Sequence, residues 1–230
     1  MVKNMLVIGA GSDFAGSFIN KFDKSEYRLF LLSREKLEHL VKDTFITNDY
    51  FSHLDQIKAL VEKNSISEII IFNGCIYEGI ENRFISNNEI IDTFIVNFVL
   101  PACIINKVNT LEKTPRYTVI SSIAAAKLRT KNYYYGLSKQ ALEEFILSQP
   151  QGNFFIFRSG FIHTKLTNLH TQPPLSTTKE KAATRLHKKF IKQQKRKVKF
   201  SYSSNSIYFL FVIFRVMPKK LLDFIENRLI

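Results

Sequence analysis

Short, continuous apolar runs alternate with segments of helical periodicity along most of the chain. The runs cover residues 5–8, 27–32, 45–47, 69–72, 117–120 and 153–158, and a last, alternating run covers 198–202. Continuous apolar runs of this length are typical of parallel strands buried on both faces. Between them, apolar residues recur at helical spacing in residues 54–61, 87–108 and 133–149. The alternation predicts an α/β domain.

The first predicted strand leads into a turn that contains Gly9, Gly11 and Gly16. Glycines at such a turn let the backbone approach a pyrophosphate, which then lies at the positive N-terminus of the following helix. After the second strand comes Ser33-Arg34, where NAD-binding proteins tend to place an acidic residue. An arginine instead offers a planar cation to a 2′-phosphate, with Lys36 close by. A plain strand–helix turn and a solvated arginine are the alternatives.

Tyr135 and Lys139 lie four residues apart in a predicted helix, so they share one face. An ammonium beside a phenol favours the phenolate, and we therefore predict a lowered pKa for Tyr135. A tyrosine tuned in this way can exchange a proton with a carbonyl or alcohol oxygen near neutral pH. The spacing also occurs by chance in many helices. Ser122 ends a predicted strand thirteen residues before Tyr135, and this further polar residue argues against a chance occurrence of the Tyr135–Lys139 spacing.

In this order, the glycine turn, Ser122, Tyr135 and Lys139 resemble the short-chain dehydrogenase/reductase superfamily over residues 3–165. The resemblance implies a Rossmann fold, with about seven parallel strands in a doubly wound sheet. Two features depart from the family pattern. Only Gly9 matches its Gly-x-x-x-Gly-x-Gly turn, since Asp13 and Ala15 occupy the other two positions, and Ser159 stands where proline usually precedes Gly160.

The resemblance also assigns roles. Tyr135 would pass the proton, Lys139 would lower its pKa and bind the ribose, Ser122 would bind the substrate oxygen, and Asn97 would relay protons through water. For Asn97 a satisfied core amide, and for Asp49 a helix N-cap, are the alternatives. The implied cofactor is NADP(H) rather than NAD(H), and the implied cofactor contacts are Gly9, Gly11, Ser12, Asp13, Phe14, Arg34, Asp49, Asn73, Gly74, Tyr135, Lys139, Gly160, Ile162 and Thr164. We expect no metal, because no Cys/His ligand spacing occurs.

Composition adds a charge asymmetry to this picture. The 230 residues carry a net charge of +13, and residues 179–230 contain 14 Lys/Arg against 3 Asp/Glu. Such a block implies an anionic partner: membrane lipid, a phosphate-bearing substrate or nucleic acid. Two cysteines in apolar surroundings indicate a reducing compartment rather than a disulfide framework. We expect the domain in residues 1–202 and a basic, apolar tail in residues 203–230.

The tail contains an unbroken apolar run at residues 207–214, which is far shorter than the ~20 residues a spanning helix needs. It fits an interfacial anchor or, alternatively, a core or dimer helix. The basic segment 179–199, predicted as a helix with an apolar stripe, and this tail look loosely like bacterial reductases of cell-envelope glycans or polyprenylphosphoryl keto-sugars. We therefore predict a cytoplasmic reductase, peripheral on the inner membrane face, acting on a sugar- or lipid-linked intermediate. The alternative is a non-catalytic dinucleotide sensor that binds nucleic acid or a partner. The intact set of Asn97, Ser122, Tyr135 and Lys139 argues against this sensor, and we do not expect nucleic acid as a partner. The sequence does not decide whether the protein forms a homo-oligomer.

Overall fold

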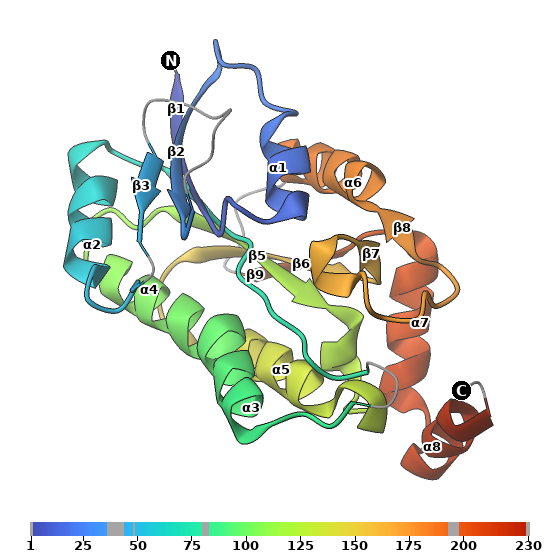
Figure 1. The fold of residues 1–230 in the computed structure, drawn as a ribbon. Helices are drawn as coiled ribbons and strands as arrows, with labels where there is room; N and C mark the ends of the chain where they lie inside the picture. Colours follow the sequence, from blue (N-terminus) through green and yellow to red (C-terminus); the bar gives the residue numbers. More distant parts are fainter. Residues whose placement is uncertain (1, 36–43, 48, 80–82, 193–197, 229–230) are drawn as a thin grey trace.

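A parallel sheet forms the centre of the molecule (Figure 1). The structure is a computed structural model, and it describes residues 2–35, 44–47, 49–79, 83–192 and 198–228. Within these residues seven strands pair in the order β3-β2-β1-β4-β5-β6-β9, which confirms the predicted doubly wound sheet. The strands are β1 (Lys3–Ile8), β2 (Tyr27–Ser33), β3 (Thr44–Ile46), β4 (Glu68–Ile71), β5 (Arg116–Ser122), β6 (Asn153–Ser159) and β9 (Val198–Tyr202).

Helices cover both faces of the sheet, as Figure 1 shows. One face carries α1 (Asp13–Ile19) and α6 (Lys179–Ile191), and the other carries α2 (Leu54–Lys63), α4 (Leu100–Val108) and α5 (Tyr133–Ser148). Side chains of a strand alternate between its faces. Accordingly, Leu6 and Ile8 pack towards α2 and α4, whereas Met5 and Val7 pack towards α1 and α6.

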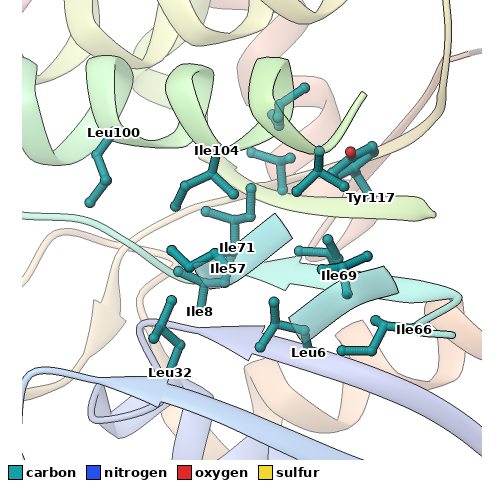
Figure 2. Close-up of a cluster of buried hydrophobic side chains, with 14 of the residues drawn as sticks. Leu6, Ile8, Leu32, Ile57, Ile66, Ile69, Ile71, Leu100, Ile104 and Tyr117 are labelled. Atoms are coloured by element: carbon teal, nitrogen blue, oxygen red, sulfur yellow. The ribbon is translucent and has the colours of Figure 1, made fainter. Parts of the chain in front are cut away.

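The core on the α2–α4 side is a dense cluster of aliphatic side chains (Figure 2). Leu6 and Ile8 of β1, Ile69 of β4 and Ile104 of α4 have no exposed surface. Burying each such side chain stabilises the fold by about 1.5–3 kcal/mol. The run of α3 (Asn87–Phe94), η1 (Ile95–Val99) and α4 is long and apolar enough to span a membrane, but here it packs against this sheet. It is thus placed as the core helix of an α/β domain.

The pairing of β4 with β5 is fixed at their first residues by a charged pair. Glu68 lies opposite Arg116, which donates to its carboxylate through Nε at 2.7 Å and also through Nη2. Burial raises the pKa of Glu68, and the guanidinium opposes that shift. A one-residue slip would separate the two charges and turn every side chain to the wrong face.

The remaining short elements lie around the carboxyl ends of the strands. They are η2 (Ile123–Ala126), η3 (Thr130–Asn132), β7 (Ile162–His163), η4 (Lys165–Thr167), β8 (Thr177–Thr178), α7 (Asn205–Val216) and α8 (Lys219–Arg228). The proline-containing segment 171–178 ends in β8, which pairs in parallel with β7. The tail folds into α7 and α8, and Ile207 and Phe211 of α7 are buried against Ile123. Lys36 and the basic run 193–197 lie outside the described residues.

Candidate active site

A cavity of about 370 Å³ opens at the carboxyl ends of β1, β2 and β4. In doubly wound sheets, ligands bind at this edge where the strand order reverses. The cavity lining includes seven of the predicted cofactor residues: Gly9, Gly11, Ser12, Arg34, Asp49, Asn73 and Gly74. The structure therefore brings these seven residues together in one cavity.

The wall between β1 and β4 is suited to a close approach of a polar ligand. Gly9 has a φ of +74°, and a Cβ there would lie 3.1 Å from the backbone nitrogen of Asn73. Asn73 Oδ1 is buried and accepts no hydrogen bond from the described residues. A buried acceptor without a partner is costly, so a ligand hydroxyl is a natural donor for it. The ribose of a dinucleotide fits this wall.

The side chains of Asp13 and Phe14 face away from the cavity. Asp13 Oδ2 accepts a hydrogen bond from the Lys165 backbone nitrogen at 2.7 Å, and its other oxygen is 3.7 Å from Lys179 Nζ. Phe14 is buried edge-to-face against Phe72, with 5.2 Å between ring centroids. Asp13, which stands where the family has a glycine, thus has a structural role. Its carboxylate connects the first residue of α1 to Lys165, at the start of η4.

Arg34 and Asp49 line the outer part of the cavity. Arg34 is exposed, so its guanidinium is free to meet an anion from solution. Asp49 Oδ1 accepts from the backbone nitrogens of Phe51 and Ser52, both at 3.1 Å, and these bonds lower its pKa. The N-cap of α2 is His53, so Asp49 caps the preceding turn rather than the helix.

Lys139 and Asn97 form the buried floor beside the cavity. Lys139 is 2% exposed, and its Nζ donates to the carbonyls of Asn73 at 3.1 Å and Ile120 at 3.2 Å. Asn97 accepts from the Cys75 nitrogen at 2.9 Å and donates to the Cys75 carbonyl at 2.9 Å and to Ser138 Oγ at 3.1 Å. Both side chains therefore hold the β4–α3 connection against α5.

Asn97 reaches this position through a turn of π-helix. The five-residue π-helical segment η1 lies immediately before α4, and Pro101 stands in the first turn of α4. A π-helical turn is wider than an α-helical one, and such turns often occur at functional sites. Here the turn places a fully buried amide among three polar partners, as a buried amide requires.

Tyr135 and Ser122 face each other at the end of β5. A hydrogen bond from Ser122 favours the Tyr135 phenolate, but burial outweighs it and raises the pKa of Tyr135 to about 12. The predicted lowering by Lys139 is thus wrong for the protein alone. Lys139 Nζ lies 6.0 Å from the tyrosine ring centroid and bonds to two backbone carbonyls instead. Burial lowers the pKa of Lys139 to about 8, although Cys75 and Glu143 oppose the shift.

A carboxylate from a distant loop caps the helix that carries Tyr135. Glu78 accepts from the backbone nitrogens of Tyr134 at 2.9 Å and Tyr135 at 2.7 Å, whereas the N-cap residue Asn132 makes no side-chain capping bond. His170 Nε2 donates to the Glu78 carbonyl at 2.8 Å. No pattern in the sequence predicts the role of Glu78, because the cap arrives from a loop far from α5 in the chain.

A buried ion pair anchors the other side of α5. Arg158 of β6 donates to Glu143 through Nε at 2.9 Å and Nη2 at 2.6 Å, and to the Tyr202 hydroxyl at 2.7 Å. Ser121 Oγ donates to the same carboxylate at 2.6 Å. Glu143 follows Lys139 by one helical turn, and that spacing was the available signal for it.

Gly160, Ile162 and Thr164 follow β6 on the far side of Ser122. A Cβ on Gly160 would lie 2.5 Å from Ile207 Cδ1, so this glycine permits α7 to pack closely. Ile162 is buried in β7, and the Thr164 backbone nitrogen donates to Thr167 Oγ1 at 3.1 Å. These predicted contacts border the site without lining the cavity between β1, β2 and β4.

Solved structures share this arrangement of strands and helices. A short-chain dehydrogenase from Burkholderia cenocepacia J2315 in complex with NADP superposes with a TM-score of 0.76 at 12% identity, covering 96% of this chain and 95% of the other. This chain has the short-chain dehydrogenase/reductase fold. A short-chain dehydrogenase from Streptomyces avermitilis gives 0.72 at 17% identity (100% and 96% covered). Thermoplasma acidophilum aldohexose dehydrogenase gives 0.68 at 17% (90% and 94%). No family model and no curated protein matches the sequence.

Proposed function

We propose that this protein is an NADP(H)-dependent oxidoreductase that interconverts a carbonyl and a hydroxyl group. One observation carries the proposal: Lys139 and Asn97 lie against the cavity residues Asn73 and Gly74, where the Asn73 Oδ1 has no partner among the described residues. Tyr135 lies on the same helix as Lys139 and is hydrogen-bonded to Ser122. When bound there, the nicotinamide supplies or accepts the hydride. Cofactor contacts fall to the cavity residues Gly9, Gly11, Ser12, Arg34, Asp49, Asn73 and Gly74.

The protein's own contribution is to handle the proton and orient the carbonyl. Because its pKa is raised, the Tyr135 phenol is protonated at neutral pH and can donate to a developing alkoxide. Ser122 lies beside it and supplies a second contact for the same oxygen. Lys139, with a pKa of about 8, holds an exchangeable proton near neutral pH, and Asn97 keeps the loop around it in place.

Replacing Tyr135 by phenylalanine tests the catalytic assignment. Loss of a general acid typically reduces the rate by about 10²–10⁴. We expect that loss in NADPH consumption for Tyr135→Phe, with NADPH affinity nearly unchanged. Tyr134→Phe is the matched control, and it should retain turnover. Near-normal turnover of Tyr135→Phe on the true substrate would refute the role, and tight NADPH binding without turnover on any carbonyl would favour a sensor.

Arg34 is the residue that we assign to the 2′-phosphate. A charge-assisted hydrogen bond is worth about 1.5–3 kcal/mol, so Arg34→Ala should reduce the preference for NADPH over NADH by about 10–150-fold. Glu35 lines the same cavity and carries the opposite charge, so Glu35→Ala is the control that should keep or increase that preference. Equal affinities in the wild type would contradict the assignment.

For the substrate we propose a sugar- or lipid-linked intermediate of glycan biosynthesis, handled in the cytoplasm. Two observations support it: one protein of the same fold is named an aldohexose dehydrogenase, and the C-terminal quarter of the chain combines cationic and apolar surface. A screen of keto-sugars, free, nucleotide-linked and polyprenylphosphoryl-linked, with NADPH consumption as the readout, tests this. Activity confined to simple aliphatic ketones would refute it.

A further inference from the structure

Helix α7 has one buried and one exposed apolar face. Ile207 and Phe211 are buried against Ile123 of η2. On the opposite side Phe209 is 63% exposed and Val216 is 74% exposed. We call the exposed apolar side chains of α7 and α8 the outer face; they are Tyr208, Phe209, Val212, Ile213, Val216, Leu221 and Phe224. Single exposed apolar residues are ordinary, but seven of them on two consecutive helices indicate an interaction surface.

The outer face is bordered by cations and, along α7, by no anion. Residues 205–220 contain no Asp or Glu, whereas Arg215, Lys219 and Lys220 are all exposed. Apolar side chains next to exposed cations match a surface that is anionic above and apolar beneath.

We propose that the outer face docks the protein on an anionic membrane surface, with the apolar side chains at the acyl boundary and the cations among the lipid headgroups. The twelve residues of α7 span about 18 Å, which is too short to cross a hydrocarbon core of about 30 Å. The helix therefore lies in the interface. A second copy of the chain is the poorer occupant, because residues 205–220 contain no Asp or Glu that could pair with Arg215, Lys219 and Lys220 across a two-fold contact between two α7 helices.

The docking surface lies beside the candidate active site. Helix α7 packs on η2, which begins at the residue after Ser122, and its Ile207 fits against Gly160. In Figure 1, α7 and α8 lie together at one side of the molecule, with α8 following the C-terminal end of α7. Docking in this orientation brings the site close to lipid headgroups, but the docking itself does not depend on the proposed reductase activity.

Vesicle co-sedimentation of the full chain tests the proposal. The probes are phosphatidylcholine vesicles with and without phosphatidylglycerol, each at low and high salt. We expect binding only with the anionic lipid and weaker binding at high salt, since salt screens the charges. Each lysine near an anionic surface contributes about fivefold, so Lys219→Gln with Lys220→Gln should reduce partitioning about thirtyfold. Lys24→Gln with Lys63→Gln removes the same charge elsewhere and should leave binding nearly intact.

The apolar contribution is tested with Phe209→Glu, which should abolish co-sedimentation. Ile91→Glu on α3 is its control, because Ile91 is also exposed and lies on another helix. An unchanged circular dichroism melt shows that Phe209→Glu folds; if it does not fold, Val216→Glu replaces it. Absence of wild-type binding to every vesicle, full binding by the outer-face variant, or a concentration-dependent dimer that the variant dissociates would each overturn the proposal.

Discussion

Replacing Arg158 by methionine should destabilise the protein strongly while preserving most of its packing volume. The guanidinium lies 4.0 Å from the ring centroids of both Phe200 and Phe211 and pairs with Glu143 through two nitrogens. The side chains of the pair are 9% and 6% exposed. Arg158→Met leaves the Glu143 carboxylate buried, with Ser121 Oγ as its remaining side-chain donor among the described residues. Breaking a buried pair in this way costs about 3–5 kcal/mol.

A double variant shows whether the loss of stability in Arg158→Met comes from the unpaired Glu143 carboxylate or from the loss of the arginine side chain itself. Replacing both Glu143 and Arg158 by methionine removes both charges, and such replacements are often neutral or stabilising by about 1–4 kcal/mol. The double variant should therefore be more stable than Arg158→Met alone. Urea unfolding is the suitable measurement, because guanidinium would screen the charges, and far-UV circular dichroism reports it in a chain without tryptophan. The reasoning is refuted if Arg158→Met lowers the free energy of unfolding by less than about 1 kcal/mol. It is also refuted if the effects of Arg158→Met and Glu143→Met simply add in the double variant, because the pair would then be effectively hydrated.

Three further predictions follow from the site. Glu78→Gln removes the charge of the α5 cap, so it should lower the free energy of unfolding by about 1 kcal/mol and lower kcat more than it changes KM. The control Glu112→Gln, at an exposed position, should change neither stability nor kcat. Between pH 8 and 10.5 the wild type should gain stability relative to Lys139→Met, because Lys139 has lost its proton in the folded protein and keeps it in the unfolded chain. A difference in the free energy of unfolding that does not change with pH would contradict the burial of this amine. Gly9→Ala should weaken NADPH binding through its positive φ and the close Asn73 nitrogen, whereas Gly16→Ala, with open space around it, should bind normally.

The strands and the cavity could be predicted because their signals are local. An unbroken run such as residues 69–72 is buried on both faces, and the residue after each strand end then falls on the ligand-binding edge. Gly9 was therefore identifiable from its position after β1, whereas Asn73, two residues after β4, was assigned through the resemblance to the short-chain dehydrogenase/reductase superfamily. The small β8 strand was missed, since two residues carry no periodicity.

Long-range electrostatics could not be predicted in the same way. The spacing of Tyr135 and Lys139 indicates a shared helix face, but it does not reveal how deeply each side chain is buried or which carbonyls hold the ammonium. Burial decides both shifts, raising the pKa of Tyr135 and lowering that of Lys139. Glu78 and Arg158 come from other elements to hold α5, and no pattern within residues 133–149 announces them.

The same contacts explain how a tail outside the sheet can affect a site inside it. Phe211 of α7 covers the Arg158 guanidinium, Arg158 fixes Glu143, and Glu143 lies one turn from Lys139 on the helix that carries Tyr135. A displacement of α7 would expose the ion pair to water and weaken its grip on α5, because the pair depends on exclusion of solvent. Membrane docking through the opposite face of α7 would favour the packed position of this helix, because anything that binds only the folded protein raises its stability. We therefore expect anionic vesicles to raise the melting temperature of the wild type, and to raise that of Phe211→Ala less. An equal rise in both proteins would show that docking is not transmitted through this contact.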